Sequence, residues 1–304
     1  ITRTDYKFDG AGYLPKEHWH VWVIDAETGE ATQLTDGDKD ETEPRWSPDG
    51  RHILFNSNRS DRPDMDLDAT ELYLIPAEGG EMRQLETRPG RKFGAVFSPD
   101  GQHVAYLGRD KPGRWYQNAR LYIAPINGGE VRDISGEIDL HLGSSTNGDI
   151  FNGSGPYLPV WSADGRRIYI SASWHGDEPL VSLAAFEPNA GYEQLIAGPG
   201  VVGGYTFDRE RTRVAWLWAT LDDPVQLRVR DIDASGAAGE PRTLTALNPW
   251  HDEIERGEIE EVWFKARDGF DLHGWILKPA GFDPSRKYPS ILQIHGGPQT
   301  QYGN

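Results

Sequence analysis

The residues of this chain best suited to chemistry lie near its end, in the run His295-Gly296-Gly297-Pro298. A short apolar stretch, residues 291–294, leads directly into them. This pattern is typical of a buried parallel strand that ends in a loop. Glycine adopts positive φ and has no Cβ, so its backbone N–H can approach a ligand and stabilise an oxyanion. The alternative is an ordinary glycine turn after a strand.

A second candidate is a basic, aromatic insertion at residues 109–116. Arg109 and Arg114 could bind the carboxylate of a peptide, because a guanidinium pairs with a carboxylate through two parallel hydrogen bonds. A solvent-exposed surface loop is the alternative interpretation of this insertion.

Three other patterns resemble ligand sites, but each lacks a required part. Residues 198–203 fit G-x-G-x-x-G, yet a strand-like segment follows where a dinucleotide site needs a helix. Residues 64–68 begin like a calcium loop that lacks its glycine and its final glutamate. His18 and His20 share a strand face without a third metal ligand. The sequence therefore predicts neither a cofactor nor a metal.

Composition restricts the class of protein. The 304 residues include 31 Lys and Arg and 48 Asp and Glu, a net charge of −17. This acidity argues against nucleic acid or an anionic membrane as a partner. Cysteine is absent, which excludes disulfides, thiolate catalysis and Cys-ligated zinc. No apolar stretch reaches membrane-spanning length and no signal peptide opens the chain, which is compatible with a cytoplasmic location.

A repeat organises the rest of the chain. The motif Trp-Ser-Pro-Asp-Gly at residues 46–50 recurs with small changes at 97–101 and 161–165, and a degenerate copy starts at Phe207. Proline presets φ and glycine accepts the conformation that ends the turn, so each copy predicts a turn before a buried strand. A glycine pair at 79–80, repeated later, predicts a hairpin between two further strands.

Each repeat unit therefore predicts four antiparallel strands, which is typical of a β-propeller blade. Four and a half blades leave two sheet edges open, which soluble proteins avoid. We therefore expect the ring to close with material outside this sequence, and the open edges favour assembly into a homo-oligomer. The units cover residues 20–35 (the last two strands of a blade), 41–87, 92–135, 157–197 and 203–245, within a partial propeller domain at 1–258.

The pattern changes after residue 258. Strands are predicted at 259–266 and 272–277, joined by an Arg-Asp-Gly turn, and a polar loop then leads to the strand before His295. Three strands cannot bury both faces of an α/β sheet without helices. Residues 259–304 are therefore interpreted as the N-terminal part of an α/β-hydrolase domain whose remainder another segment supplies.

Propeller turns of this type, followed by strand–Asp-Gly–strand–Tyr-Pro–strand–His-Gly-Gly-Pro, resemble the prolyl oligopeptidase family of serine peptidases, in particular the acylaminoacyl-peptidase subfamily. The resemblance covers the whole chain and is most specific over residues 261–303. It implies a seven-bladed propeller that caps an α/β-hydrolase domain, with a Ser-Asp-His triad between them. It also implies that Gly297 donates its N–H to the oxyanion, that Gly296 belongs to the same catalytic loop, and that His295 braces this loop.

The chain departs from this family in lacking a Gly-x-Ser-x-Gly nucleophile motif. The nearest approach, residues 143–147, fails at its last position. The resemblance therefore implies that the triad lies beyond residue 304 and that two to three blades precede residue 1.

Three hypotheses follow. The first is the propeller and oxyanion-loop portion of a serine peptidase that hydrolyses short peptides, with the remaining segments of the same enzyme as its partner. The second is a non-enzymatic TolB-like propeller that binds a protein and carries a degenerate hydrolase appendage. The third, a lipase or esterase, shares the oxyanion loop but would not carry a propeller. The sequence leaves open whether the peptidase removes acyl-amino acids, dipeptides or C-terminal residues.

Overall fold

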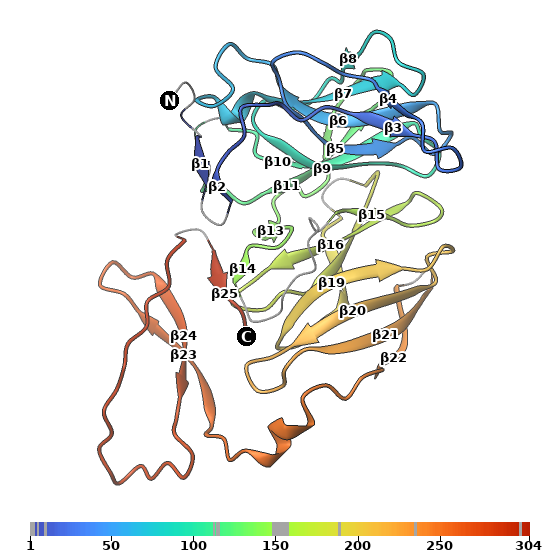
Figure 1. Cartoon of the computed structure of the whole chain (residues 1–304). Helices are drawn as coiled ribbons and strands as arrows, with labels where there is room; N and C mark the ends of the chain where they lie inside the picture. Colours follow the sequence, from blue (N-terminus) through green and yellow to red (C-terminus); the bar gives the residue numbers. More distant parts are fainter. Residues whose placement is uncertain are drawn as a thin grey trace. The chain divides into compact units, whose positions relative to one another are not determined.

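The computed structural model describes residues 4, 6–8, 11–111, 113, 116–147, 158–187, 190–233, 236–297 and 300–304. It forms two compact units, one of Ile1–Gly143, Pro156–Ile170 and Val181–Glu193, the other of Ser144–Gly155, Ser171–Leu180 and Gln194–Asn304. The described ranges contain β-strands and two short 3-10 turns, Leu67–Ala69 and Pro249–Glu253 (Figure 1). No helix within these ranges is long and apolar enough to span a membrane.

Two four-stranded antiparallel meanders lie in the first unit, at the positions where the repeat predicts blades. In each sheet, consecutive strands are hydrogen-bonded in the order of the sequence, as a blade requires. The first sheet contains β5 (Glu41–Trp46), β6 (His52–Asn58), β7 (Thr70–Pro76) and β8 (Arg83–Gln84), and the second contains β9 (Lys92–Phe97), β10 (His103–Gly108), β11 (Arg120–Pro125) and β12 (Arg132–Asp133).

Two further sheets follow along the chain. One adds a strand that the repeat did not predict, β13, which pairs with β16 in the order β13-β16-β17-β18, while β15 also pairs with β16. The other is the meander β19-β20-β21-β22. Their strands are β13 (His141–Leu142), β15 (Val160–Trp161), β16 (Arg167–Ser173), β17 (Leu180–Ala184), β18 (Tyr192–Ile196), β19 (Val201–Phe207), β20 (Arg213–Ala219), β21 (Gln226–Asp233) and β22 (Gly236–Thr243).

Two hairpins precede these sheets. The half blade predicted at residues 20–35 is present as β3 (Trp22–Ile24) paired with β4 (Ala31–Gln33). A hairpin of β1 (Lys7–Phe8) and β2 (Gly12–Tyr13) was not predicted. The structure therefore confirms the expected antiparallel sheets, while the expected number of seven blades stays a prediction.

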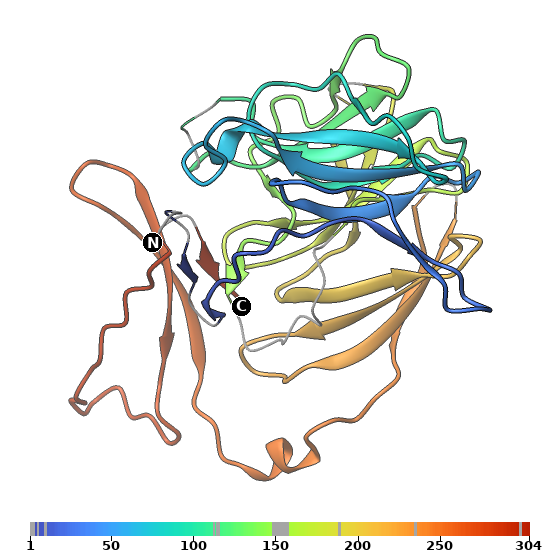
Figure 2. The same cartoon turned by 45° about the horizontal axis from the view of Figure 1, so that its top comes forward.

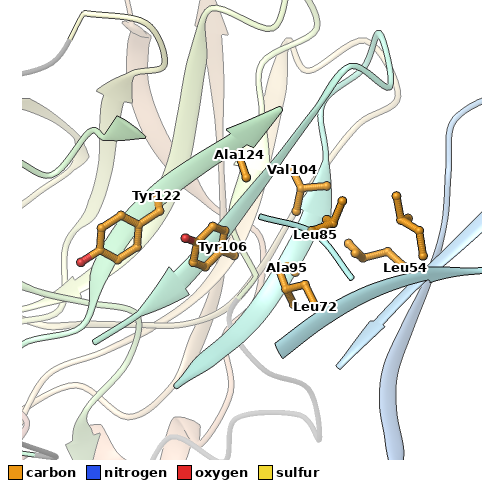
Figure 3. Close-up of a cluster of buried hydrophobic side chains, with 9 residues drawn as sticks. Leu54, Leu72, Leu85, Ala95, Val104, Tyr106, Tyr122 and Ala124 are labelled. Atoms are coloured by element: carbon orange, nitrogen blue, oxygen red, sulfur yellow. The ribbon is translucent and has the colours of Figure 1, made fainter. Parts of the chain in front are cut away.

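The core of the first unit lies between the two meanders (Figure 3). Leu54 and Leu72 from the first sheet pack with Val104 and Tyr106 from the second, and all are almost fully buried. Tyr106 stacks on Tyr122 with a centroid distance of 5.4 Å. Side chains at alternate positions of these strands therefore fill the space between the two sheets. Burial of this apolar area stabilises the packing of one sheet on the other.

The repeated Ser-Pro-Asp-Gly turn is built by the same hydrogen bonds in each copy. Ser98 Oγ donates to Asp100 Oδ1 at 2.5 Å and accepts the His103 N–H at 3.0 Å. The Gln102 N–H donates to Asp100 Oδ1 at 3.0 Å, and these bonds hold the pKa of Asp100 below its usual value. Gly101 has φ +69°, which explains the glycine. The serine is therefore part of the turn and not a nucleophile.

Replacing Ser98 by alanine is expected to destabilise the chain by about 1–2 kcal/mol, because Ser98 itself is buried and its loss leaves Asp100 without a donor and the His103 N–H without its acceptor. The midpoint of urea unfolding measures this loss. Ser290→Ala, at an exposed position, is the matched control. Equal midpoints for the two variants would contradict the proposed role of the turn serine.

The C-terminal region contains one hairpin, β23 (Ile259–Lys265) with β24 (Asp271–Leu277), as predicted. The apolar residues 291–294 do not form the predicted buried strand, since Ile291 is 96% exposed and Ile294 82% exposed. A buried parallel strand needs neighbours on both edges, and no described strand pairs with this segment. The α/β-hydrolase part and the boundary at residue 258 therefore stay predictions.

Candidate active site

The loop at His295–Gly297 is exposed and is shaped around one peptide group, the one that joins Gly296 to Gly297. Its carbonyl oxygen accepts a hydrogen bond from Thr300 Oγ1 at 3.1 Å, and His295 Nδ1 lies 3.1 Å from the same oxygen. The peptide is trans, so its N–H points away from its carbonyl. Among the described residues, none accepts a hydrogen bond from the Gly297 N–H. Within the described part of the loop, the Gly297 N–H is therefore a donor whose direction is restrained and which has no acceptor.

Gly297 could not be another residue in this conformation. Its φ is +136°, and a Cβ built on it would lie 2.1 Å from Thr300 Oγ1 and 3.1 Å from Thr300 Cβ. Both the backbone conformation and the close approach of Thr300 thus require a glycine. At Gly296 a Cβ would meet nothing within 4 Å, so the steric requirement falls on the second glycine of the pair.

His295 has a geometry that suits its expected bracing role. Because the Gly296 carbonyl can only accept a hydrogen bond, the contact with His295 requires a proton on Nδ1. The imidazole also meets the Tyr302 ring edge-on, with centroids 5.2 Å apart. The role of His295 in catalysis stays a prediction.

The segment after the loop is held within the second unit by a strand pairing that the sequence did not reveal. β25 (Gln301–Tyr302) pairs in parallel with β14 (Thr146–Asn147), and both views show the red end of the chain beside this green segment (Figures 1 and 2). The Gln301 N–H donates to the Ser145 carbonyl at 3.1 Å, and the Gly303 N–H donates to the Asn147 carbonyl at 2.9 Å. The loop thus ends at a fixed point.

The side chain of Gln301 adds three hydrogen bonds to this attachment. Its Nε2 donates to Thr146 Oγ1 and to the Asp177 carbonyl, both at 2.9 Å, and its Oε1 accepts the Gly176 N–H at 2.9 Å. The Asn304 N–H donates to the Gly176 carbonyl at 2.7 Å. Every polar atom of the Gln301 amide is therefore used, which explains an amide at this position.

The serines at residues 143–147 do not form a nucleophile elbow. They belong to an extended segment that leads into β14 and not to a strand-to-helix turn. Ser144 Oγ donates to Glu178 Oε2 at 2.8 Å, and the Ser145 N–H donates to Ser173 Oγ at 2.8 Å. The setting of these serines thus supports the expectation that the nucleophile lies elsewhere.

Glu178 is a buried carboxyl beneath the attached tail that sequence reasoning missed. It is 0% exposed. Burial raises its pKa to about 7, and the hydrogen bond from the Ser144 hydroxyl opposes this rise. Its backbone N–H donates to the Gly200 carbonyl at 3.0 Å, beside the residues that hold Gln301. No local pattern in the sequence distinguishes this glutamate from exposed ones.

The two arginines proposed for substrate binding have different outcomes. Arg109 is half-buried; its Nε donates to the Gln117 carbonyl at 2.9 Å and its guanidinium lies 5.8 Å from the centre of the Phe93 ring. These contacts close the base of the insertion. Arg114 lies outside the described residues. Contact between Arg109 and a substrate stays a prediction.

The remaining candidate sites are explained by ordinary contacts. His18 Nδ1 lies 3.2 Å from Asp40 Oδ1, and His20 Nδ1 lies 2.8 Å from Glu41 Oε2. Asp64 in the acidic loop accepts the Thr4 N–H at 2.7 Å. Residues 198–203 lead into strand β19. Within the described ranges, no group of three or more His, Cys, Asp or Glu residues is arranged to hold a metal.

The described residues form propeller-type sheets and, close to the C-terminus, an exposed glycine loop in which the Gly297 N–H has no acceptor among them. No family model matches the chain. It is 26% identical over 277 residues to dipeptidyl-peptidase 5 of Trichophyton equinum, covering 85% of this chain and 35% of that protein. It is 26% identical over 308 residues to the uncharacterized peptidase YuxL of Bacillus subtilis, covering 98% and 44%. The chain thus spans less than half of the relatives it matches.

Solved structures show the same fold. The acylaminoacyl peptidase of Pyrococcus horikoshii superposes with a TM-score of 0.55 at 20% identity, over 93% of this chain and 50% of that one. TolB of Acinetobacter baumannii superposes with a TM-score of 0.51 at 14% identity, over 74% and 48%. The sequence relatives confirm the resemblance to peptidases of the prolyl oligopeptidase family. The acylaminoacyl-peptidase subfamily stays a prediction.

Proposed function

We propose that this chain is the propeller and oxyanion-loop portion of a serine peptidase that hydrolyses short peptides. The observation that carries the proposal is the Gly296–Gly297 peptide, whose carbonyl is held while its N–H, in an exposed loop, has no acceptor among the described residues. The peptidases among its sequence relatives support the same reaction class.

The mechanism assigns one step to this chain. A serine attacks the scissile carbonyl carbon, a histidine takes the serine proton, and negative charge develops on the carbonyl oxygen. The Gly297 N–H donates to this oxyanion, together with the N–H that follows the nucleophile. His295 keeps the loop in place through the Gly296 carbonyl. The nucleophile, base and orienting acid belong to the part of the enzyme that this chain does not include.

The propeller-type sheets suit a size filter in front of such a site. Folded proteins would be kept from the nucleophile, and short peptides would reach it. The resemblance implies tyrosine at the position of His295 in prolyl oligopeptidase and dipeptidyl peptidase relatives, so the histidine favours the acylaminoacyl-peptidase subfamily. The substrate class stays open. A cytoplasmic location and assembly into a homo-oligomer belong to the same proposal.

The test is an activity assay of the complete polypeptide that contains this chain. N-acetyl-aminoacyl and unblocked dipeptidyl p-nitroanilides are supplied separately, and a fluorophosphonate probe reports an activated serine. We expect hydrolysis of at least one substrate class, with loss of activity after the probe reacts. The 304-residue chain is the control, and it should hydrolyse neither substrate.

The opposite result favours the second function. If the complete polypeptide neither hydrolyses these substrates nor reacts with the probe, the peptidase proposal is wrong. The fold similarity to TolB would then favour a binding module, whose partner could be sought by affinity capture.

A further inference from the structure

We propose that Thr300 is a positioning residue for the oxyanion donor, and that Asn147 on β14 orients Thr300 in turn. The inference rests on the proposed function, because it assigns the geometry of the same Gly297 N–H. It is carried by contacts among residues of the second unit.

The first step concerns the peptide plane. The carbonyl of Gly296 and the N–H of Gly297 belong to one planar trans group, so a bond that fixes the carbonyl also fixes the direction of the N–H. Thr300 Oγ1 makes that bond at 3.1 Å. The same hydroxyl occupies the space beside Gly297 Cα that a Cβ would need. Thr300 therefore restrains the donor by a hydrogen bond and by contact.

The second step concerns the direction of the hydroxyl. A threonine hydroxyl has one proton and two lone pairs. Because the Gly296 carbonyl can only accept, the proton is directed toward it, and a lone pair accepts Asn147 Nδ2 at 3.3 Å. The amide of Asn147 thus orients the hydroxyl, and the chain of bonds runs from Asn147 through Thr300 to the Gly296 carbonyl. Hydrogen bonds in such a chain polarise one another, which strengthens the N–H as a donor.

The third step concerns the anchor. Asn147 pairs with Tyr302 in the β14–β25 ladder, and its carbonyl accepts the Gly303 N–H at 2.9 Å. The side chain that orients Thr300 is therefore held by the same ladder that fixes the end of the loop. An exposed glycine loop has few restraints of its own, so the N–H is preorganised by this external anchor.

The test substitutes Thr300 and Asn147 in the complete enzyme and measures hydrolysis of its best peptide substrate. Thr300→Val keeps the shape and removes the hydroxyl, and we expect kcat to fall about tenfold while KM changes less than twofold. Thr300→Ser keeps the hydroxyl and should restore kcat to within about twofold of the wild type. Asn147→Ala should lower kcat by a few-fold and add little in combination with Thr300→Val.

Thr32→Val, at an exposed position on β4, is the matched control and should leave both constants unchanged. Thermal unfolding of each variant shows whether it is folded. If Thr300→Val does not fold, Thr300→Ser and Asn147→Ala still carry the test.

The outcomes separate this inference from the proposed function. If Gly297→Val abolishes activity but Thr300→Val retains the wild-type kcat, the positioning role is overturned and the function stands. A rise in the KM of Thr300→Val as large as the fall in its kcat would also overturn the positioning role. So would a Thr300→Ser variant as slow as Thr300→Val, because either result indicates that Thr300 acts by packing. An inactive, probe-unreactive complete polypeptide overturns both.

Discussion

Replacing Gly297 by valine in the complete enzyme is expected to lower kcat by about 10²–10³-fold with little change in KM, the loss typical of one oxyanion donor. A branched side chain is strained at φ +136°, and its Cβ would overlap Thr300 Oγ1. The loop must move, and the N–H moves with it. Because the donor interacts with charge that exists only in the transition state, substrate binding is spared.

Steady-state kinetics with a peptide p-nitroanilide measure this effect. Gly281→Val is the matched control, because Gly281 also has positive φ, is exposed and has no neighbour within 4 Å of a Cβ. It imposes backbone strain without touching the loop. A Gly297→Val enzyme with the wild-type kcat would show that this N–H does not contact the oxyanion.

Replacing Glu178 by glutamine is expected to make the chain more stable at pH 8 by about 3 kcal/mol and to flatten its dependence on pH. The native pKa of about 7 lies above the usual 4.5 of a glutamate, so the folded state favours the neutral acid. The associated stability is fully present below about pH 4.5 and is lost as pH rises through 7. Each unit of pKa shift corresponds to 1.36 kcal/mol. Glutamine has nearly the same shape and no charge to desolvate.

Urea unfolding at pH 4.5, 6 and 8 measures this difference. Wild type and Glu178→Gln should agree at pH 4.5 and diverge as pH rises. Glu255→Gln, which changes an exposed carboxylate, should follow the wild type at every pH. Parallel curves for wild type and Glu178→Gln would contradict the expected burial of a charge.

Local patterns predicted the sheets well because their causes are local. The Ser-Pro-Asp-Gly turns close within a few residues, and the glycine pairs mark hairpins whose strands are neighbours in sequence. The positive φ of Gly297 could be predicted for the same reason, since glycines in a Gly-Gly pair often adopt positive φ. These features need no knowledge of distant parts of the chain.

The attachment of the C-terminal residues and the burial of Glu178 depend on contacts with distant residues, which no local sequence pattern predicts. The attachment of Gln301 to Thr146 joins residues 155 positions apart, and Glu178 differs from an exposed glutamate only through its surroundings. The error at residues 291–294 has the same origin. Their apolar character predicts burial, but a strand is buried only where neighbouring strands exist to cover it.

The parallel pairing of β14 with β25 has a consequence for folding order. The meanders close between neighbouring strands, whereas the bond from Asn147 to Thr300 spans 153 residues. Contacts of high sequence separation carry a larger loop-closure entropy and form late. The glycine loop is therefore expected to take its final shape only after the sheets have formed. A refolding enzyme should regain its β-sheet circular dichroism before its catalytic activity.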